Sequence, residues 1–189
     1  MQTLTTSPAA EIIRNGVNVT ALRETIAAVK GDPTLAEFEF RATNKWEDGA
    51  RNLATVRDFH GTNVEHTHKD LLHVQMDEPP VLLGKDTGLN PVEVLLSALS
   101  GCMTTSLAYY AANLGLSIES IDSELEGDID LKGFLGIDPN VRKGFQEIRV
   151  KFRVKGDATA AQVKELLGNS PVLDTIANPV RIKIDVVTE

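Results

Sequence analysis

An uncharged stretch of 25 residues, from Val94 to Ile118, constrains the fold of this chain more than any other feature. A segment this long and apolar either spans a membrane or forms the buried central helix of a domain. Hydroxyl and amide side chains interrupt the stretch, and no basic cluster flanks it, which is unlike a membrane span. Long amphipathic strands follow and need an apolar surface to cover. We therefore expect a buried helix and no membrane association.

A complete helix start signal precedes the stretch. Asn90 can act as the N-cap, Pro91 suits the first helical position, and Glu93 occupies the acidic position of a capping box. Gly115 is suited to end the helix shortly after Asn113. At ~1.5 Å per residue such a helix is roughly 35 Å long, which is enough to cross a small domain.

Length and composition exclude several classes of protein. The chain has 189 residues, a formal net charge of −8 and one cysteine. The negative charge argues against nucleic acid as a partner, because binding there requires clustered Lys and Arg to neutralise phosphates. One cysteine excludes an intrachain disulfide and a Cys-rich zinc site. Residues 1–15 lack the basic and apolar regions of a secretory signal, so we expect a cytoplasmic protein.

Before the long helix, apolar residues first recur at helical spacing and then alternate with polar residues, as in a strand. We divide the chain into residues 1–36, an N-terminal arm with a short helix, and residues 37–189, one domain. The elements predicted before the long helix are, in chain order, a loose arm (1–16), a helix (19–30) and strands (38–46, 53–59 and 71–76), with Asp48-Gly49 as a hairpin turn.

Two later strands carry opposite charges on their polar faces. Acidic residues alternate with apolar ones over 121–131, and basic residues do so over 148–155. If the two strands are antiparallel neighbours, the opposite charges face each other, and a slip by one residue would place a row of charges in the core. A capping-box helix near Thr159, a short helix after Ser170 and a final amphipathic strand over 180–186 complete the prediction.

Four histidines lie close together in the sequence: His60, His66, His68 and His73. In an extended segment His66 and His68 lie on one face and could bind a transition metal. No third ligand stands at a recognised spacing, so exposed loop histidines are the alternative. We predict no metal and no cofactor.

The chemistry of Cys102 can be interpreted in two ways. It lies mid-helix, with Ala98, Leu99, Thr105 and Ser106 on the same side. Free cysteine is commonly a buried, inert core residue. A reactive thiolate would need a cation or a hydrogen-bond donor, and no neighbour within the helix supplies one.

The run from Asn90 to Cys102 resembles the Asn-Pro-x-Glu-x-Leu-(x6)-Cys element of the OsmC/Ohr family, the osmotically inducible and organic-hydroperoxide-resistance proteins. The likeness extends from about Phe38 to the C-terminus. It includes Ser170-Pro171-Val172, where the family often has Cys-Pro-Val. The resemblance implies an α+β fold, with curved antiparallel sheets around a long central helix, in an intertwined homodimer.

The resemblance also implies a chemistry, and this sequence departs from it at three positions. In the peroxidase members one cysteine reduces an organic hydroperoxide, a second forms a disulfide with it, and an Arg and a Glu activate the thiol. Cys102 matches the first cysteine, but Ser170 replaces the second. Val92 occupies the position of the activating Glu, and Glu47 aligns with the activating Arg. The chain therefore resembles the wider OsmC-like branch more than the dedicated peroxidases.

Nearby residues could substitute for the missing groups. Glu93 stands one position after Val92. Nine residues separate it from Cys102, and at about 100° per residue this places the two side chains on opposite faces of the helix. We therefore expect Glu93 to cap the helix. Arg51 or Arg41 could replace the activating arginine.

Two functions from different classes follow. One is a one-cysteine thiol peroxidase that acts on organic hydroperoxides in oxidative-stress defence, with Cys102 as nucleophile and an external thiol as reductant. The other is a non-catalytic protein that binds a small hydrophobic ligand in a pocket at the dimer interface. The apolar loop Gly133–Ile137 could serve either as a lid or as a dimer contact, or it could pack on the chain's own core.

Overall fold

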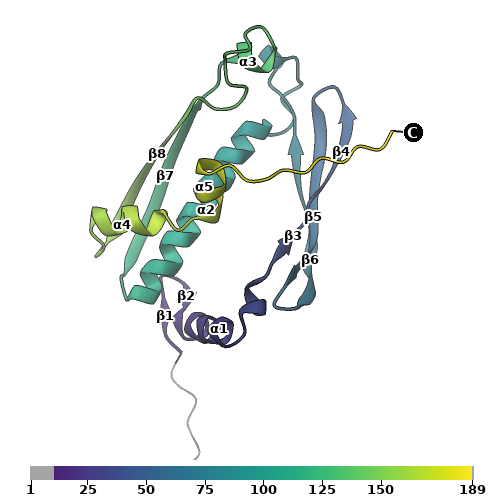
Figure 1. Cartoon of the computed structure of the whole chain (residues 1–189). Helices are drawn as coiled ribbons and strands as arrows, with labels where there is room; N and C mark the ends of the chain where they lie inside the picture. Colours follow the sequence, from purple (N-terminus) through teal and green to yellow (C-terminus); the bar gives the residue numbers. More distant parts are fainter. Residues whose placement is uncertain (1–10, 189) are drawn as a thin grey trace, which may run out of the picture. The chain divides into compact units, whose positions relative to one another are not determined.

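The computed structural model describes residues 11–188 (Figure 1). These residues form two compact units, one that ends at Leu95 and one that begins at Leu96. The division falls within the long helix. The predicted boundary after residue 36 separates an N-terminal arm from a domain, which the division at Leu95 does not test. It stays a prediction.

The first unit combines short helices with an antiparallel sheet. Strand β5 pairs antiparallel with β3, β4 and β6. The elements of this unit are, in chain order, β1 (Ile13–Arg14), β2 (Val17–Asn18), α1 (Val19–Gly31), η1 (Pro33–Ala36), β3 (Glu39–Phe40), β4 (Thr43–Asp48), β5 (Arg51–Gly61), β6 (Val64–Met76), η2 (Pro80–Leu82) and the first turn of α2 (Pro91–Leu114).

Residues 11–18 are more ordered than predicted. Residues 1–10 of the predicted loose arm lie outside the described residues. Beyond them, β1 and β2 form a small hairpin, and Asn18 then caps α1 by accepting a hydrogen bond from the backbone N–H of Ala21 at 2.9 Å. The predicted helix over 19–30 is confirmed as α1, with one more residue at its end.

The predicted strands are present with different boundaries. The strand expected over 38–46 is divided into β3 and β4, both of which pair with β5. Strand β6 begins at Val64, seven residues before the predicted start at Leu71. A tight turn at Thr62 and Asn63, both with positive φ, joins β5 to β6 and was not predicted. The first part of β6 has polar side chains on both faces, so hydrophobic periodicity did not reveal this part of the strand.

A buried carboxylate organises the loop that leads to α2. Asp77 is 1% exposed and accepts hydrogen bonds from the backbone N–H groups of Glu78, Lys85 and Thr87 and from the Thr87 hydroxyl. Burial by itself would raise the pKa of Asp77, but these hydrogen bonds outweigh it and hold the pKa at about 2. At Gly84 a Cβ would lie 1.8 Å from the carbonyl oxygen of Glu78, so the loop closes only with glycine there.

The second unit is built around the remainder of α2. Its core contains Leu99, Met103, Leu107 and Ala111 from α2, packed against three residues of α4 and against the apolar faces of β7 and β8. Gly115 ends the helix in the left-handed conformation (φ 82°), as predicted. The further elements of this unit are β7 (Ile118–Asp128), α3 (Leu131–Phe134), β8 (Glu147–Gly156), α4 (Ala160–Leu167) and α5 (Pro171–Ala177). The α+β class is confirmed.

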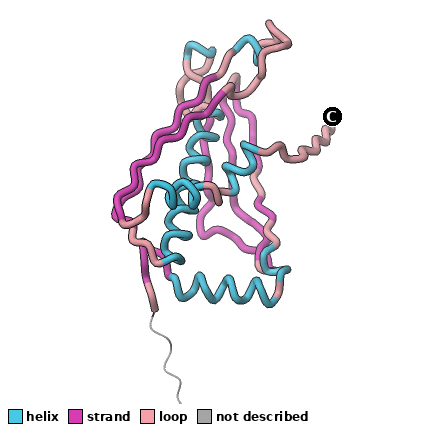
Figure 2. Tube along the Cα trace, turned by 60° about the vertical axis from the view of Figure 1, so that its left-hand side comes forward, coloured by secondary structure: helices cyan, strands magenta, loops and turns pink. Residues whose placement is uncertain are grey.

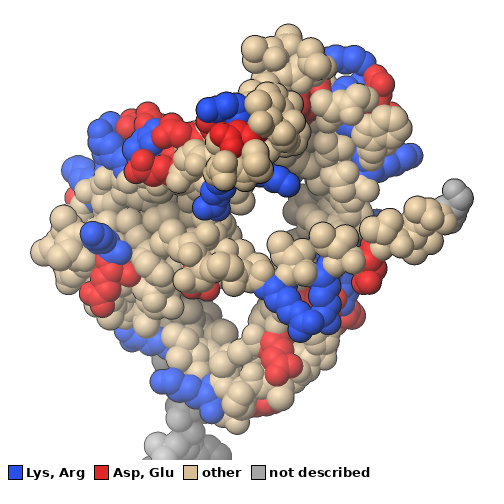
Figure 3. All heavy atoms as spheres, turned by 45° about the horizontal axis from the view of Figure 1, so that its top comes forward, with Lys and Arg blue, Asp and Glu red and all other residues tan. Residues whose placement is uncertain are grey.

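Strands β7 and β8 are neighbours with their charged rows facing each other, as expected for an antiparallel pair. They are antiparallel and lie side by side along their length (Figure 2), with Glu124 opposite Lys151 and Glu126 opposite Arg149. Glu124 also accepts a hydrogen bond from Arg153 at 2.6 Å. Acidic and basic side chains are interleaved on the charged surface in Figure 3. Each strand thus turns its charges outward and its apolar residues toward the core.

The prediction of a final strand over residues 180–186 is wrong for the single chain. Residues 178–188 belong to no helix or strand. The alternation of apolar and polar residues is present, but a strand also requires a partner for its backbone hydrogen bonds, and the described chain offers none to this segment.

Helix α2 has the length and composition of a membrane span, as a helix of a protein core also can. Four of its residues are part of the core of the second unit, as expected for the central helix of a domain. Only 22% of its most apolar window is buried within the chain, so much of the helix surface is uncovered.

Candidate functional site

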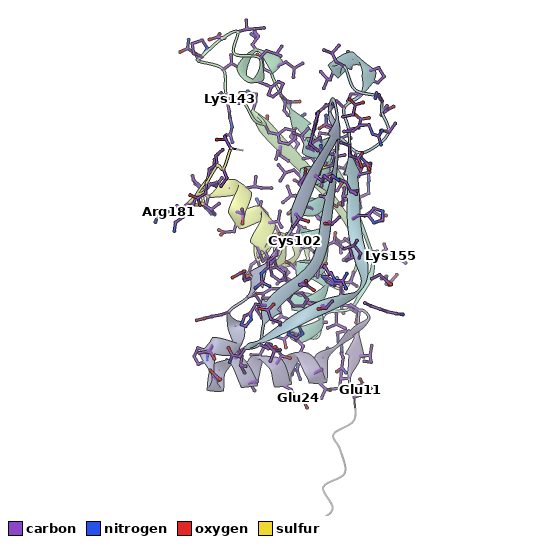
Figure 4. The ribbon with its side chains drawn as sticks, turned by 90° about the vertical axis from the view of Figure 1, so that its right-hand side faces the viewer. Glu11, Glu24, Cys102, Lys143, Lys155 and Arg181 are labelled. Carbon is purple, nitrogen blue, oxygen red and sulfur yellow. The ribbon has the colours of Figure 1, made fainter. Side chains whose placement is uncertain are left out.

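Cys102 lies in the middle of α2 and is half-buried (Figure 4). Met103 follows it, and Ser106 stands one turn later; both are buried, whereas Gly101 before it is exposed. Cys102 therefore lies at the border between the core face and the open face of the helix. Within residues 96–188 no hydrogen bond reaches its Sγ atom. The thiol is free, and its half-burial is compatible with access by a reactant.

Glu93 has the capping role that the sequence predicts. Its carboxylate accepts a hydrogen bond from the backbone N–H of Asn90 at 3.0 Å, and the Asn90 side chain accepts one from the backbone N–H of Val92 at 2.8 Å. These bonds satisfy groups at the start of α2 that otherwise lack helical partners. A role of Glu93 in activating a thiol stays a prediction.

Arg51 lies on β5 in the first unit and pairs with Glu47. The distance from its Nη2 to the Glu47 carboxylate is 3.1 Å. Its Nε atom is buried and has no hydrogen-bond partner among residues 11–188. The resemblance aligns Glu47 with the family's activating arginine, and on that alignment this chain has a carboxylate at that position and an arginine beside it. The Nε–H group of that guanidinium is therefore a buried donor without an acceptor among these residues.

Arg41, the other candidate, is occupied by two carboxylates. Its guanidinium donates two hydrogen bonds to Glu65, at 2.8 and 3.2 Å, and one to Glu39 at 2.6 Å. The hydrogen bond from Arg41 is the main cause that lowers the pKa of Glu65 to about 2, and burial opposes it. Of the two arginines, Arg51 is thus the better candidate for a further anionic partner.

Ser170 is completely buried at the start of α5. Its Oγ accepts a hydrogen bond from the backbone N–H of Leu173 at 3.2 Å, so it serves as the helix N-cap. A hydroxyl cannot form a disulfide. The position that the resemblance assigns to a resolving cysteine therefore has a structural function here.

The histidines do not form a metal site. Among residues 11–188 no three His, Cys, Asp or Glu side chains are grouped so that they could hold a metal ion. His66 instead stacks on Phe59, with ring centroids 4.8 Å apart, and His68 lies 5.4 Å from the same ring. His60 contacts Glu65 at 3.1 Å.

An aromatic cluster on the first unit was not predicted. Phe59 lies 5.6 Å from Phe40 and 6.5 Å from Phe38, in stacked geometry, and the two imidazoles adjoin it. The signal was available in the sequence, because these side chains share one face once β3, β5 and β6 are in register. Phe40 is 76% exposed, so the cluster presents an aromatic surface.

Comparison with solved structures shows the fold. The chain is similar to an OsmC-like protein from Mycoplasma pneumoniae, with a TM-score of 0.55, 15% identity, and coverage of 75% of this chain and 89% of the other. It is also similar to an OsmC-like protein from Vibrio cholerae, with a TM-score of 0.53, 12% identity, and coverage of 72% and 92%. At these identities the likeness concerns the fold alone.

A third similar structure is a putative osmotic stress induced and detoxification response protein from Psychrobacter arcticus. Its TM-score is 0.53 at 14% identity, with coverage of 71% of this chain and 85% of the other. No curated protein matches the sequence. The family model of OsmC-like proteins matches residues 84–185, which include Cys102, Ser170 and more than half of the chain. The chain therefore belongs to the OsmC-like protein family.

Proposed function

We propose that this protein is a one-cysteine thiol peroxidase for organic hydroperoxides. The Cys102 thiolate attacks the terminal peroxide oxygen, the O–O bond breaks, and the alkoxide leaves and takes up a proton as the alcohol. Cys102 becomes a sulfenic acid. An external thiol then forms a mixed disulfide with Cys102 and releases water. A second external thiol restores the Cys102 thiol and leaves as the disulfide.

The observation that carries this proposal is the position and state of Cys102. It is the residue of α2 that matches the nucleophile of the family element, it is free, and it is half-buried, whereas Leu99 and Met103 on the same helix are buried in the core. Ser170 is buried and cannot form a disulfide, which supports reduction by an external thiol.

We assign Arg51 the part of the activating cation. Its buried Nε–H, which lacks a partner among the described residues, supports this assignment, and so do the contacts that already occupy Arg41. A guanidinium that donates to sulfur favours the thiolate. Glu47 would orient the guanidinium through the contact at 3.1 Å.

We further propose that the protein is a homodimer in the cytoplasm. The support is the uncovered part of α2, where Tyr109, Tyr110 and Leu114 are 50%, 45% and 63% exposed. Large apolar side chains grouped at one end of a helix favour a protein partner over water.

The test is the rate of thiol loss when an organic hydroperoxide such as cumene hydroperoxide is added to the reduced protein. We expect stoichiometric loss of one thiol in the native protein and none in Cys102→Ser, with a pH midpoint below the value of about 8.5 for a free thiol. A rate equal to that of free cysteine across this pH range would refute the proposal.

The assignment of Arg51 has its own control. Arg51→Ala should raise the pH midpoint of thiol loss and slow the reaction at neutral pH, and Arg51→Lys should restore part of the rate. Arg57 lies on the same strand, is exposed, and serves as the matched control, so Arg57→Ala should leave both quantities unchanged. If Arg51→Ala and Arg57→Ala behave alike, another group activates Cys102.

The alternative function is the binding of a small hydrophobic ligand, and the exposed apolar residues of α2 are the observation that favours it. This function needs no activated thiol. Titration with a medium-chain fatty acid, followed by calorimetry, separates the two. Saturable binding that Cys102→Ser leaves intact, together with an unreactive thiol, would support the binding protein and contradict the peroxidase.

A further inference from the structure

We propose that the loop between β7 and β8, residues 129–146, docks the protein on the surface of a phospholipid bilayer with anionic headgroups. This segment, the α3 loop, includes the short helix α3. The proposal depends neither on the peroxidase nor on the homodimer proposed above. The sequence argues against a bilayer span by α2, whereas the α3 loop enters only the interface of one leaflet.

The α3 loop leaves a group of large apolar side chains in water. Leu131, Phe134, Leu135 and Ile137 are 40%, 71%, 60% and 67% exposed, and these four residues are the apolar tip of the loop. In Figure 1, α3 lies beyond the ends of β7 and β8 of the same unit. Single exposed apolar residues are ordinary on a protein surface, but a group of them marks a surface that binds a partner or a membrane.

The conformation of the α3 loop is fixed by its own contacts. Asp130 caps α3, because its side chain accepts the backbone N–H of Lys132 at 3.0 Å. At Gly133 a Cβ would lie 2.5 Å from the carbonyl oxygen of Arg142, so the two arms of the loop touch there. Gly136 has a φ of 69°, which favours glycine. The apolar tip is therefore held in water by a folded loop.

The backbone N–H groups of the apolar tip find acceptors inside the loop. The N–H groups of Gly133, Leu135, Gly136 and Ile137 each donate to a carbonyl oxygen of residues 130–133, at 2.8 to 3.3 Å. A segment that enters a bilayer loses water as a hydrogen-bond partner, so unpaired peptide groups make entry costly. These four groups are paired before any membrane is met, which favours entry of the tip.

Two cations stand beside the apolar tip without a carboxylate partner. Arg142 and Lys143 are exposed on the returning arm of the loop and form no ion pair among residues 11–188. Lys143 is labelled in Figure 4. The acidic side chains of the loop are already engaged, since Asp130 pairs with Lys132 at 3.2 Å and Asp138 accepts hydrogen bonds from within the loop. The loop thus offers apolar side chains together with unpaired positive charge.

This combination favours an anionic bilayer over a protein partner. Cations are attracted to anionic headgroups, and apolar side chains beside them enter the boundary between headgroups and acyl chains. A stable protein interface needs about 800 Å² and roughly 20–30 residues from each partner, which is more than the tip of one loop offers. The net charge of −8 opposes binding only weakly, because at about 0.1 M salt charges are screened beyond roughly 10 Å.

The test is flotation of the full chain with vesicles of phosphatidylcholine alone and of phosphatidylcholine mixed with phosphatidylglycerol. We expect binding to the mixed vesicles, weakened by added salt. Arg142→Gln with Lys143→Gln should weaken it by roughly fivefold for each charge removed. Arg57→Gln with Lys69→Gln removes the same charge from exposed positions of β5 and β6, and this matched control should leave binding unchanged.

Insertion of the apolar tip has its own measurement. Phe134→Trp in a Trp46→Phe background places the single tryptophan of the chain on the tip, and lipids with brominated acyl chains should quench its fluorescence. Phe40→Trp in the same background is the control, because Phe40 is 76% exposed in the aromatic cluster of the first unit, and it should not be quenched. Phe134→Ser with Ile137→Ser should weaken vesicle binding by roughly tenfold or more and leave the thermal midpoint unchanged.

Several outcomes would overturn the docking of the α3 loop on a bilayer. One is the absence of binding to both kinds of vesicle, and another is binding that neither double variant in the loop weakens. Equal binding to the two kinds of vesicle would also overturn it, because anionic headgroups would then have no part. If Phe134→Ser with Ile137→Ser dissociates a dimer in sedimentation, the tip joins two copies of the chain and does not face a bilayer.

Discussion

The Oγ atom of Ser170 accepts the backbone N–H of Leu173 at 3.2 Å, and this contact caps α5 with a side chain that is completely buried. The same position is the one where the resemblance places a resolving cysteine. This chain thus has a structural hydroxyl where the resemblance assigns a redox thiol, and the difference can be tested in both directions.

Removal of the hydroxyl should destabilise the second unit. Ser170→Ala leaves the N–H of Leu173 without its acceptor, and the loss of an N-cap typically costs about 0.5–2 kcal/mol in the free energy of unfolding. Chemical denaturation measures this change. Ser120→Ala, at an exposed position of β7, is the control and should have no measurable effect. Equal stability of the two variants would show that the cap contributes nothing.

A thiol at position 170 should change the fate of oxidised Cys102. If the resemblance assigns these two positions correctly, Ser170→Cys will lose two thiols for each hydroperoxide consumed, because the sulfenic acid condenses with the new thiol. A shift in mobility on a non-reducing gel reports the disulfide. The same substitution in a Cys102→Ser background should show neither change. Loss of only one thiol would mean that the two positions do not meet.

The carboxylate of Asp77 should stabilise the first unit only above acid pH. Its pKa is lowered from the ordinary 3.8 to about 2 in the folded protein. A carboxyl group with a lowered folded pKa stabilises the fold above its unfolded pKa and loses that contribution as the pH falls through the folded value. The midpoint of thermal unfolding should therefore fall between about pH 4 and pH 2 in the native protein.

Asp77→Asn should lower the midpoint at neutral pH and flatten this acid dependence, because an amide cannot accept from Lys85 and Thr87 as a carboxylate does. Asp86→Asn is the matched control in the same loop. It lies at an exposed position with positive φ, which asparagine tolerates, and should change little. A parallel acid dependence in Asp77→Asn and the native protein would contradict this account.

Reversal of the basic row should destabilise the sheet of β7 and β8. In the triple variant Arg149→Glu, Lys151→Glu and Arg153→Glu, like charges would face one another in the observed register. We expect a measurably lower unfolding midpoint that recovers in part at high salt, because salt screens exposed charges. Reversal of Asp122, Glu124 and Glu126, the residues opposite these three, to Lys in the same chain should restore it. An unchanged midpoint in the triple variant would remove the charge pairing as a determinant of register.

Shortening the side chain of Leu107, at the centre of α2, should lower the free energy of unfolding more than the other substitutions. Leu107 is fully buried in the core cluster of the second unit, and Leu107→Ala leaves a cavity there. Such substitutions cost about 2–5 kcal/mol in the free energy of unfolding. Leu114→Ala removes the same atoms at a position that is 63% exposed and should cost far less in the monomer. Similar losses in both would mean that Leu107 is not a core residue in solution.

Signals that act over a few residues were predictable from the sequence. The start of α2 at Asn90 and Glu93, its end at Gly115 and the capping box of Thr159 and Gln162 are all present. Each depends on bonds between residues two to four positions apart, so the local sequence suffices. The outward placement of the charged rows of β7 and β8 was predictable for a related reason, since a slip by one residue would place a row of charges in the core.

The sequence by itself determined the long helix α2 with its start and end signals, the charged strands β7 and β8, and the resemblance in which Cys102 matches the family nucleophile. Only the tertiary structure decided what these residues contact: that Ser170 is a buried cap, that Glu47 pairs with Arg51, and that Asp77 organises a loop through bonds to residues eight and ten positions away. It also decided that the alternating C-terminal segment is not a strand in one chain. Periodicity specifies which side chains share a face, but hydrogen bonds and burial depend on what the fold brings opposite that face.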